Sequence, residues 1–391
     1  MEASPSLEAL VHEWEAELGP EVLAQARYQE RMRVARFLMG LVVPLMLVIL
    51  WLPTGWAVAL REMLSGNTSW WGTWAVILVI LLSEALLAFP LSWYFDFHLE
   101  NQLGLNRQSF GGWLLDELKQ AGLAIPLQSL LFLALYGVLR LLPERWLLPG
   151  FAGVVVVFLA LIYLLQPVFL RMKFKTEPLE DPELEARIRR LFEKAGVPFA
   201  GLSVVKAGEK TARSNAALVP RGVGTEVVLF DTLLESMSPE AIEDVVAHEL
   251  GHKVHRDMLK LMVVLGVTLV LALAAGYGVL RWAGTWDGLQ GPQDVATFPL
   301  LTAVLAWLGA GFQIVLNAYM RRVEFAADAY AVRLTGNAAA FEEAMRVLVK
   351  QNKTLPQPSL WVERLLYNHP SPARRVQAVR QWAARQGTSS A

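Results

Sequence analysis

Long apolar stretches alternate with short polar ones along most of this chain. Six of these stretches reach or approach the roughly 20 apolar residues with which a helix crosses a bilayer. The pattern therefore predicts a mainly α-helical fold, that of a polytopic membrane protein with about six transmembrane helices. The predicted spans lie at about Phe37–Ala57, Thr73–Tyr94, Leu123–Leu142, Trp146–Leu170, Leu261–Trp282 and Phe298–Met320.

Basic residues gather at three places beside these spans and favour one orientation. They precede the first span, follow the fourth and follow the sixth, whereas the other loops carry fewer. All three clusters then fall on one side, which the positive-inside tendency makes cytoplasmic. We expect the C-terminus and the polar segment between the fourth and fifth spans to lie on that side. The clusters are Arg27, Arg31, Arg33 and Arg36; Arg171, Lys173 and Lys175; and Arg321 and Arg322.

The polar segment between the fourth and fifth spans has the pattern of a small folded unit. Asp181–Ala195 is predicted to be an amphipathic helix. Leu202–Val205 and Glu226–Phe230 are predicted to be short strands, and a Gly/Pro-rich turn is expected at Val219–Gly224. The segment therefore predicts a small β-sheet packed with helices.

Further helices are predicted around the last two spans. Ser238 followed by Pro239 marks a helix start that leads toward the fifth span. Val323–Thr335, Ala338–Gln351 and Ser371–Arg385 are predicted to be helical after the sixth span. The chain is expected to divide into an N-terminal cytoplasmic helical segment (1–36), a four-span membrane region (37–170) and a C-terminal domain with two further spans (171–391).

The amino-acid composition limits the class of protein and the kinds of metal site that are possible. Apolar residues make up 54% of the 391 residues and charged residues only 18%, and the mean hydropathy of +0.38 is typical of a membrane protein. The net charge of −1 provides no field that would attract nucleic acid. Because the chain has no cysteine, disulfides and thiolate metal sites are excluded, and a transition metal would have to bind histidine and carboxylate.

The pentapeptide His248-Glu249-Leu250-Gly251-His252 carries the strongest chemical signal. Side chains four residues apart share one face of a helix, so His248 and His252 can direct both imidazoles at one metal ion. Glu249 adjoins the same spot. In zinc hydrolases with this HExxH spacing the histidines bind the metal and the glutamate is the general base. The alternative is an ordinary helix with two solvent-facing histidines.

A hydrolytic zinc site needs a third protein ligand and an open position for water. Glu324, on a helix that leaves the sixth span, is the candidate. Asp328, one turn later, could accept a hydrogen bond from the Nδ1–H of a metal-bound imidazole and so fix its tautomer. A hairpin of the last two spans would bring the two helices to the same depth. Alternatively, the two acids only solvate the helix beside Arg321 and Arg322.

Three more residues could lie beside the predicted metal site. His369 and Arg375 could face it and stabilise a developing oxyanion. The alternative for this pair is an exposed histidine before a proline turn and a basic helix start. His255 is one turn beyond His252 on nearly the same face, and it is interpreted as a neighbour rather than a ligand.

Further motifs are spread over roughly residues 25–383. With the HExxH and the segment from Glu324 to Asp328, they resemble the type I CAAX prenyl protease family, membrane-embedded zinc endopeptidases of the gluzincin clan. The motifs are Pro90-Leu91-Ser92-Trp93-Tyr94, Leu99-Glu100, Gly104 to Ser109, Ser214-Asn215-Ala216, Val228 to Leu233, and His369-Pro370-Ser371 with Arg375.

The resemblance implies a cytoplasmic gluzincin-like zinc protease domain and a water-filled chamber between the spans. By position, His248, His252 and Glu324 would bind one Zn²⁺ ion, with Asp328 as the supporting carboxylate. Glu249 would activate water as the general base.

The resemblance also implies residues that handle the substrate. His369 and Arg375 would assist transition-state stabilisation and substrate placement. Asn215 and Ala216 would lie in a strand segment lining the cleft, where an extended peptide could pair by β-addition.

One departure limits what the resemblance implies. Eukaryotic members have seven spans, whereas six are counted here, which indicates a prokaryotic member in the bacterial inner (cytoplasmic) membrane. This weakens the inference of a prenylated substrate. We expect a zinc metalloendopeptidase that contacts the lipid bilayer and cleaves peptide or protein substrates, whether membrane-associated, lipid-modified or C-terminal tails.

Two other functions stay open at this point. One is a quality-control protease of the heat-shock type, which shares this kind of site. The other is a metal transporter or channel whose histidine and glutamate cluster conducts or senses metal. The residues also do not decide between Zn²⁺ and another divalent ion, although zinc suits two imidazoles and a carboxylate.

Overall fold

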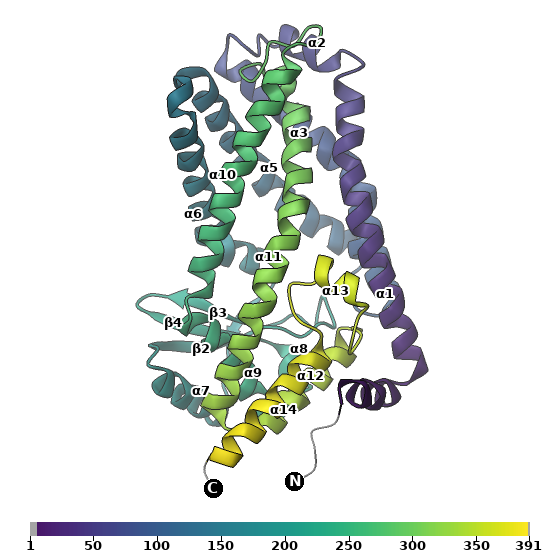
Figure 1. Ribbon diagram of the computed structural model, residues 1–391, viewed down its shortest axis with the longest axis vertical. Coiled ribbons are helices and arrows are strands. Elements are labelled where there is room, and N and C mark those ends of the chain that lie inside the picture. Colours follow the sequence, from purple (N-terminus) through teal and green to yellow (C-terminus); the bar gives the residue numbers. More distant parts are fainter. Residues whose placement is uncertain (1–5, 390–391) are drawn as a thin grey trace.

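The structure is a computed structural model that describes residues 6–389. A long bundle of helices makes up one part of the molecule, and a smaller part that contains both helices and strands lies below it, near both ends of the chain (Figure 1).

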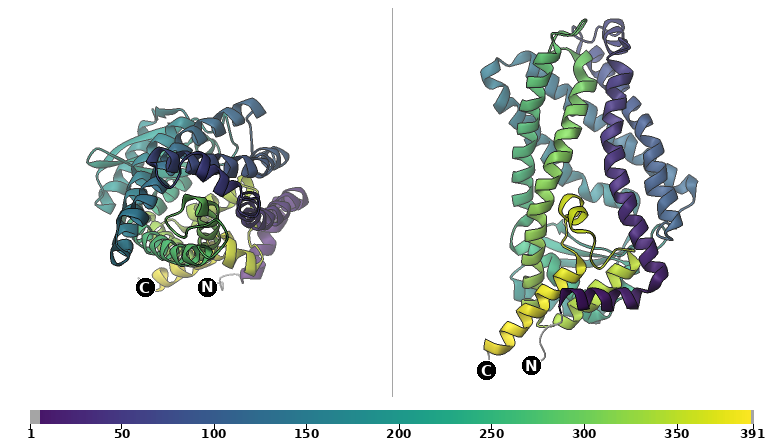
Figure 2. Two further views of the ribbon diagram at one scale, coloured as in Figure 1. Left: turned by 90° about the horizontal axis from the view of Figure 1, so that it is seen from above. Right: turned by 45° about the vertical axis from the view of Figure 1, so that its right-hand side comes forward.

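Within residues 6–389, six helices are long and apolar enough to cross a membrane, which confirms the predicted multi-pass architecture. Successive spans pack side by side and the last one returns to the first, so the spans close a ring (Figure 2). The spanning helices are α1 (Leu7–Trp51), α3 (Trp70–Ser92), α5 (Phe110–Leu141), α6 (Leu147–Lys173), α10 (Asp257–Ala283) and α11 (Phe298–Thr335).

The first span is shorter than predicted. Its helix ends at Trp51 rather than near Ala57, because the chain turns through Pro53 and through Gly55, whose φ is 74°. The short helix α2 (Trp56–Met63) follows this turn at the end of the bundle away from the termini (Figure 1).

The predicted N-terminal helical segment begins with residues 1–5, which lie outside the described residues. The rest is helical and continuous with the first span, apart from a kink where Gly19 takes a φ of 74°. Before the kink, Trp14 packs against α12 (Ala338–Gln351) and α14 (Pro372–Ser389). The start of the chain is thereby tied to its last helix.

Short helical turns connect several spans. α3 continues through the π-helical turn η1 (Trp93–His98) into α4 (Leu99–Gln102). The turn η2 (Glu144–Trp146) makes the tight connection between α5 and α6, and η3 (Val295–Thr297) leads into α11.

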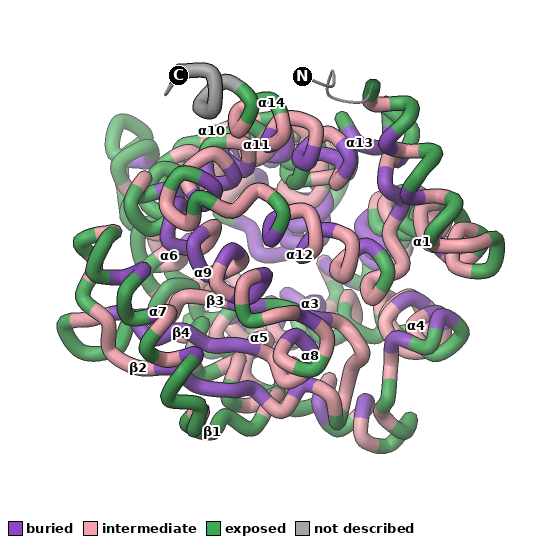
Figure 3. The backbone as a smooth tube through the Cα atoms, turned by 90° about the horizontal axis from the view of Figure 1, so that it is seen from below, coloured by how far each residue is buried: buried purple, intermediate pink, exposed green. Residues whose placement is uncertain are grey.

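A small mixed sheet lies below the ring. Its order is β1-β2-β4-β3, with β4 parallel to β2 and antiparallel to β3, and with β1 antiparallel to β2. β4 is buried along most of its length, whereas β1 at one edge is exposed (Figure 3). The strands are β1 (Thr176–Pro178), β2 (Phe199–Val205), β3 (Ala216–Arg221) and β4 (Gly224–Phe230).

The two predicted strands are present in β2 and β4, but the turn predicted at Val219–Gly224 is wrong over half its length. Val219, Pro220 and Arg221 belong to β3, and the turn is confined to the residues between β3 and β4. A proline is tolerated in β3 because this strand is at the edge of the sheet, where one side of its backbone needs no ladder partner.

Two capped helices pack on the sheet as predicted. α7 (Pro182–Ala195) begins where the Asp181 side chain accepts a hydrogen bond from the Leu184 backbone. α9 (Pro239–Val254) begins at Ser238 in the same way, after the single turn α8 (Asp231–Leu234). Their apolar faces share one buried core with the sheet.

The C-terminal helices complete the unit below the ring. The helix predicted at Val323–Thr335 is the continuation of α11, so the sixth span and this segment are one helix. α12 has the predicted bounds, and α14 begins one residue after the predicted start at Ser371 and extends past Arg385. The short α13 (Leu360–Leu366) lies between the diverging lower ends of α1 and α11 (Figure 1).

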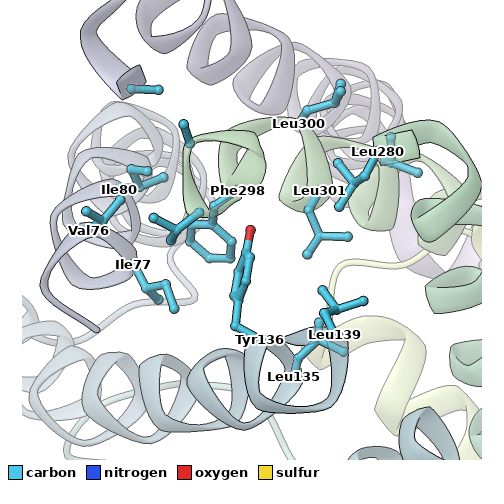
Figure 4. Close-up of a cluster of buried hydrophobic side chains, with 14 of the residues drawn as sticks. Val76, Ile77, Ile80, Leu135, Tyr136, Leu139, Leu280, Phe298, Leu300 and Leu301 are labelled. Carbon is cyan, nitrogen blue, oxygen red and sulfur yellow. The ribbon is translucent and has the colours of Figure 1, made fainter. Parts of the chain in front are cut away.

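Apolar packing fills the upper part of the ring. Tyr136 of α5 and Phe298 of α11 lie at its centre, fully buried, with ring centroids 6.3 Å apart (Figure 4). Ile77 and Ile80 of α3 and Leu280 of α10 surround them. Because lipid tails are also apolar, close contact between the spans holds this region together more than exclusion of water.

A buried polar contact closes the same end of the ring. Arg61 Nη1 donates to Asp294 Oδ2 at 2.6 Å, and Asn67 Nδ2 donates to Asp294 Oδ1 at 2.9 Å. The Asp294 side chain is fully buried, so loss of its charge would leave the buried Arg61 guanidinium with only the exposed Glu62, whose Oε1 lies 3.1 Å from Arg61 Nη2, as a counter-charge.

We predict that Asp294→Ala lowers the free energy of unfolding by about 3–5 kcal/mol, because the buried Arg61 guanidinium loses its only buried counter-charge among the described residues. Thermal unfolding of the purified protein in detergent measures the effect. The matched control is Glu144→Ala, which removes a pair with Arg281 whose side chains are 69% and 60% exposed. That change should cost less than about 1 kcal/mol. Equal shifts in the two variants would contradict the prediction.

Candidate metal centre

The two histidines of the HExxH motif and Glu324 converge on one point. His248 and His252 are one turn apart on α9, and their Nε2 atoms lie 3.1 Å from each other. Glu324 on α11 places Oε2 3.4 Å from His248 Nε2 and Oε1 3.4 Å from His252 Nε2. The structure thus brings together the three ligands expected from the sequence.

Close packing of two helices produces this convergence. α9 lies along α11, and Gly251 faces Ala327 at the contact. A Cβ atom on Gly251 would stand only 3.1 Å from Ala327 Cα and 3.3 Å from the Ala327 carbonyl oxygen. The glycine therefore allows the approach that places Glu324 between the two imidazoles.

The residues fit a divalent metal ion. Ligands bound at about 2.0–2.1 Å in tetrahedral geometry lie about 3.3–3.4 Å apart, close to the separations found here. Oε2 of Glu324 is buried and accepts no hydrogen bond among the described residues. A buried carboxylate oxygen left in this way needs a partner, and a cation bound by the two imidazoles would supply it.

Each imidazole also contacts a carboxylate through its other nitrogen. His248 Nδ1 lies 2.9 Å from Asp328 Oδ1, the contact expected from the sequence. His252 Nδ1 lies 3.1 Å from Oδ2 of Asp257, a residue that the sequence analysis missed. With Nδ1 engaged, the Nε2 lone pair of each ring is directed toward the centre.

Arg375 is placed beside the metal centre but is engaged by Asp328. Its Nε and Nη2 donate to the two Asp328 oxygens at 2.9 and 2.6 Å, a bidentate pair. Nη2 lies 3.6 Å from Glu324 Oε2. The geometry supports a part in holding Asp328, in addition to the substrate contact expected from the sequence.

The carboxylates set the charge of the metal-free site. Burial opposes the charged imidazole, but the neighbouring carboxylates of Asp328 and Glu324 outweigh it and raise the pKa of His248 to about 10. Burial likewise opposes protonation of His252, and its contacts with Glu324 and Asp257 nevertheless raise its pKa. A field that favours an imidazolium also favours a metal cation at the same place.

Glu249 lies where a general base is needed. It borders a cavity of about 140 Å³ next to the metal centre, together with Asn215, Ala216, His369 and Arg375. Burial raises the pKa of the Glu249 carboxyl. A raised pKa makes the carboxyl a better proton acceptor and brings it closer to working pH.

His369 reaches the site from the loop between α13 and α14. Its Nε2 lies 3.3 Å from Glu324 Oε1, and burial lowers the pKa of its imidazole. Arg321 fixes this loop by donating to the carbonyl oxygens of Glu363 at 3.1 Å and Tyr367 at 2.7 Å. From the sequence, Arg321 was expected only as part of the basic cluster after the sixth span, beside the acid pair.

Asn215 and Ala216 border the cavity from the sheet. Ala216 begins β3, and Asn215 directly precedes it, with its carbonyl accepting a hydrogen bond from Phe230 N at 3.0 Å. β3 is an edge strand of the sheet in the described part of the chain. β3 also lies beside α9, which carries the HExxH motif.

Asp244 is a second acid that the sequence analysis did not identify. It lies one turn before His248 on α9, lines the same cavity, and is almost fully buried. Burial raises its pKa to about 7.

His255 packs its ring against Tyr330, with ring centroids 5.6 Å apart, and is outside the group of candidate metal ligands, as the sequence analysis expected.

A ring of membrane spans with an HExxH helix, and with a carboxylate beside it as the third candidate ligand, defines a membrane-embedded metallopeptidase. Residues 178–383 match peptidase family M48, and residues 12–171 match the CAAX prenyl protease N-terminal family, described as having five membrane helices. The chain belongs to peptidase family M48. In its described residues, the stretch corresponding to the second match contains four candidate spans.

Several known proteins that are similar to this chain have names that match this assignment and the expected family. The chain is 26% identical over 309 residues to the uncharacterized metalloprotease YhfN of Bacillus subtilis (77% of this chain, 71% of that protein). It is 25% identical over 319 residues to CAAX prenyl protease 1 of Saccharomyces cerevisiae (76% and 69%). It is 28% identical over 228 residues to a Protease HtpX homolog of Trichormus variabilis (53% and 76%).

A solved structure has the same fold. The crystal structure of S. mikatae Ste24p matches with a TM-score of 0.76 over 95% of each chain, at 21% sequence identity. The protein is thus an integral membrane metalloprotease of the CAAX prenyl protease kind, and its family implies a bound metal.

We predict that Gly251→Val weakens metal binding, because the added side chain forces α9 away from Ala327 and separates the imidazoles from Glu324. Overpacking of this kind costs about 1–3 kcal/mol. Competition with a chelator measures the metal affinity. Gly311→Val is the matched control, since a Cβ at this position of α11 meets nothing within 4 Å. Unchanged metal affinity in Gly251→Val would contradict the prediction.

We also predict that Zn²⁺ affinity rises with pH. His248 must lose its proton to bind metal, and with a pKa of about 10 it is protonated at neutral pH in the metal-free protein. Below that pKa, each pH unit should increase affinity by up to about tenfold for this proton. Calorimetric titration in two buffers of different ionisation enthalpy counts the protons released. Binding at pH 7 without proton release would contradict the raised pKa.

Proposed function

We propose that this protein is a zinc endopeptidase that cleaves peptide bonds in membrane-associated substrates or in C-terminal tails. The observation that carries the proposal is the placement of Glu249 beside three converging ligands, His248, His252 and Glu324, at a cavity open to an edge strand. The donor set of two imidazoles and a carboxylate suits zinc better than a harder cation.

The proposed mechanism divides the chemistry between the ion and the protein. A bound zinc ion would supply Lewis acidity, polarising the scissile carbonyl and lowering the pKa of water. Glu249 takes the proton from the attacking water and later delivers it to the leaving amine. Its burial and raised pKa support both transfers.

Two further side chains are proposed to act on the carbonyl oxygen or to position groups that do. His369 can donate a hydrogen bond toward an oxyanion, because its imidazole lies at the rim of the same cavity. Arg375 holds Asp328 through two hydrogen bonds, and so keeps the His248 ring directed at the metal.

The substrate is proposed to bind as an added strand on β3. Asn215 and Ala216 border the cavity at one end of this edge strand, so a peptide paired with β3 would pass directly over Glu249. Main-chain hydrogen bonds would provide most of the affinity and leave sequence preference to the side-chain pockets.

The site is proposed to face the cytoplasm of a bacterium. The helix α9, which carries the HExxH motif, lies at the end of the ring near both termini (Figure 1), and the basic clusters flank the spans at that end. By the positive-inside tendency this end is cytoplasmic. Lipid-modified or membrane-anchored substrates would then reach the site from the inner leaflet.

A quality-control role is the second candidate. It is favoured by the similarity of 228 residues to a Protease HtpX homolog. Profiling of cleavage products separates the two roles, since one defined C-terminal cut supports processing and many cuts in misfolded proteins support quality control.

We predict that Glu249→Gln retains bound zinc and loses peptide cleavage by at least about 100-fold, because general-base catalysis contributes that much and the metal ligands are untouched. Metal analysis and a peptide-cleavage assay on the same purified sample provide the test. Glu243→Gln is the control, since Glu243 of α9 pairs with Arg187 of α7. Full turnover by metal-replete Glu249→Gln would rule out the assigned role.

A further inference from the structure

The two metal-binding imidazoles are supported from different helices. Asp328, which contacts His248, comes from α11, whereas Asp257, which contacts His252, is the first residue of α10. We propose that Asp257 is a positioning residue that fixes the ring and tautomer of His252 for metal binding. This inference rests on the proposed zinc-dependent function.

The contact exists because the chain breaks between α9 and α10. Residues five apart on a continuous helix point about 140° away from each other, so Asp257 could not reach His252 in an unbroken helix. α9 instead ends at Val254, and Arg256 takes the left-handed conformation, with φ 56° and ψ 38°. This turn interrupts the helical path and brings the Asp257 carboxylate to His252.

A non-glycine residue in this conformation carries a cost that the surroundings must offset. Among described residues, only Ser65 and Lys353 share a positive φ without being glycine. The strained turn at Arg256 therefore lies directly beside the contact between Asp257 and His252. The sequence had indicated a helix leading directly into the fifth span, and the break corrects that expectation.

The environment of Asp257 suits a carboxylate that orients an imidazole. Asp257 is 6% exposed, and its Oδ2 lies 3.1 Å from His252 Nδ1. Its other oxygen, Oδ1, accepts a hydrogen bond from Lys260 Nζ at 3.3 Å. The carboxylate is thus held from two sides, and the hydrogen bond from Nδ1 leaves the Nε2 lone pair free for the metal.

A competing role for Asp257 is purely structural. An acid in the first turn of α10 interacts favourably with the positive end of the helix dipole. That role predicts lower stability of the metal-free protein after substitution and no change in metal affinity. The positioning role predicts weaker metal binding with the metal-free fold retained.

The experiment uses the full-length protein in detergent and Zn²⁺ as the probe, with affinity measured by chelator competition. We expect Asp257→Ala to weaken Zn²⁺ binding about 10–100-fold, the effect of removing a carboxylate that orients a metal ligand. Asp257→Asn should lie between the wild type and Asp257→Ala, because its amide oxygen still accepts the hydrogen bond without the charge. Thermal unfolding of each metal-free protein is recorded in parallel.

Arg256→Gly is the matched control. Glycine adopts the left-handed conformation without strain, so the turn and the Asp257 contact should persist and the affinity should stay within about twofold. In Co²⁺-substituted protein, Asp257→Asn should also alter the visible absorption bands, whereas Arg256→Gly should not. A structural role alone would leave these bands unchanged.

The outcomes are separable. Wild-type Zn²⁺ affinity in both Asp257→Ala and Asp257→Asn would overturn the positioning role, even if the metal-free variants were less stable. Failure of the wild-type protein to bind Zn²⁺ would instead defeat the proposed function. Should Asp257→Ala not fold, the affinity and absorption bands of Asp257→Asn still decide the question.

Discussion

The packing of α9 on α11 is the contact on which this protein depends. It is possible because Gly251 presents no side chain to Ala327. One helix contributes two imidazoles and Glu249, and the other contributes Glu324 and Asp328. Because α11 is also a membrane span and α9 leads into the preceding span, α10, the ring of spans and the candidate metal centre are a single structure.

Much of the site could be predicted from sequence because its signals are local. The HExxH spacing, the capping residue Ser238 and the acid pair at Glu324 and Asp328 each follow from helix periodicity. Asp257 could not be found in this way. Its contact with His252 requires a helix break at Arg256, and arginine gives no sequence signal for a left-handed backbone.

The small sheet shows a second limit of sequence reasoning. Pro220 and the glycines that follow it are typical of a turn, and only the pairing with β4 makes Val219, Pro220 and Arg221 part of β3. Arg375 was expected to face the substrate, yet its guanidinium is engaged by Asp328, a partner from a helix 47 residues earlier in the chain. The division into segments at residues 36 and 170 stays a prediction.

The unbroken course of α11 has a mechanical consequence. Glu324 is part of the same rigid rod that crosses the membrane, and Asp257 starts the neighbouring rod. Helices adjust their tilt when the hydrocarbon thickness of the surrounding bilayer changes. A tilt of α11 relative to α10 would move Glu324 relative to Asp257, so a change in bilayer thickness would be transmitted to the candidate metal ligands through the spans themselves.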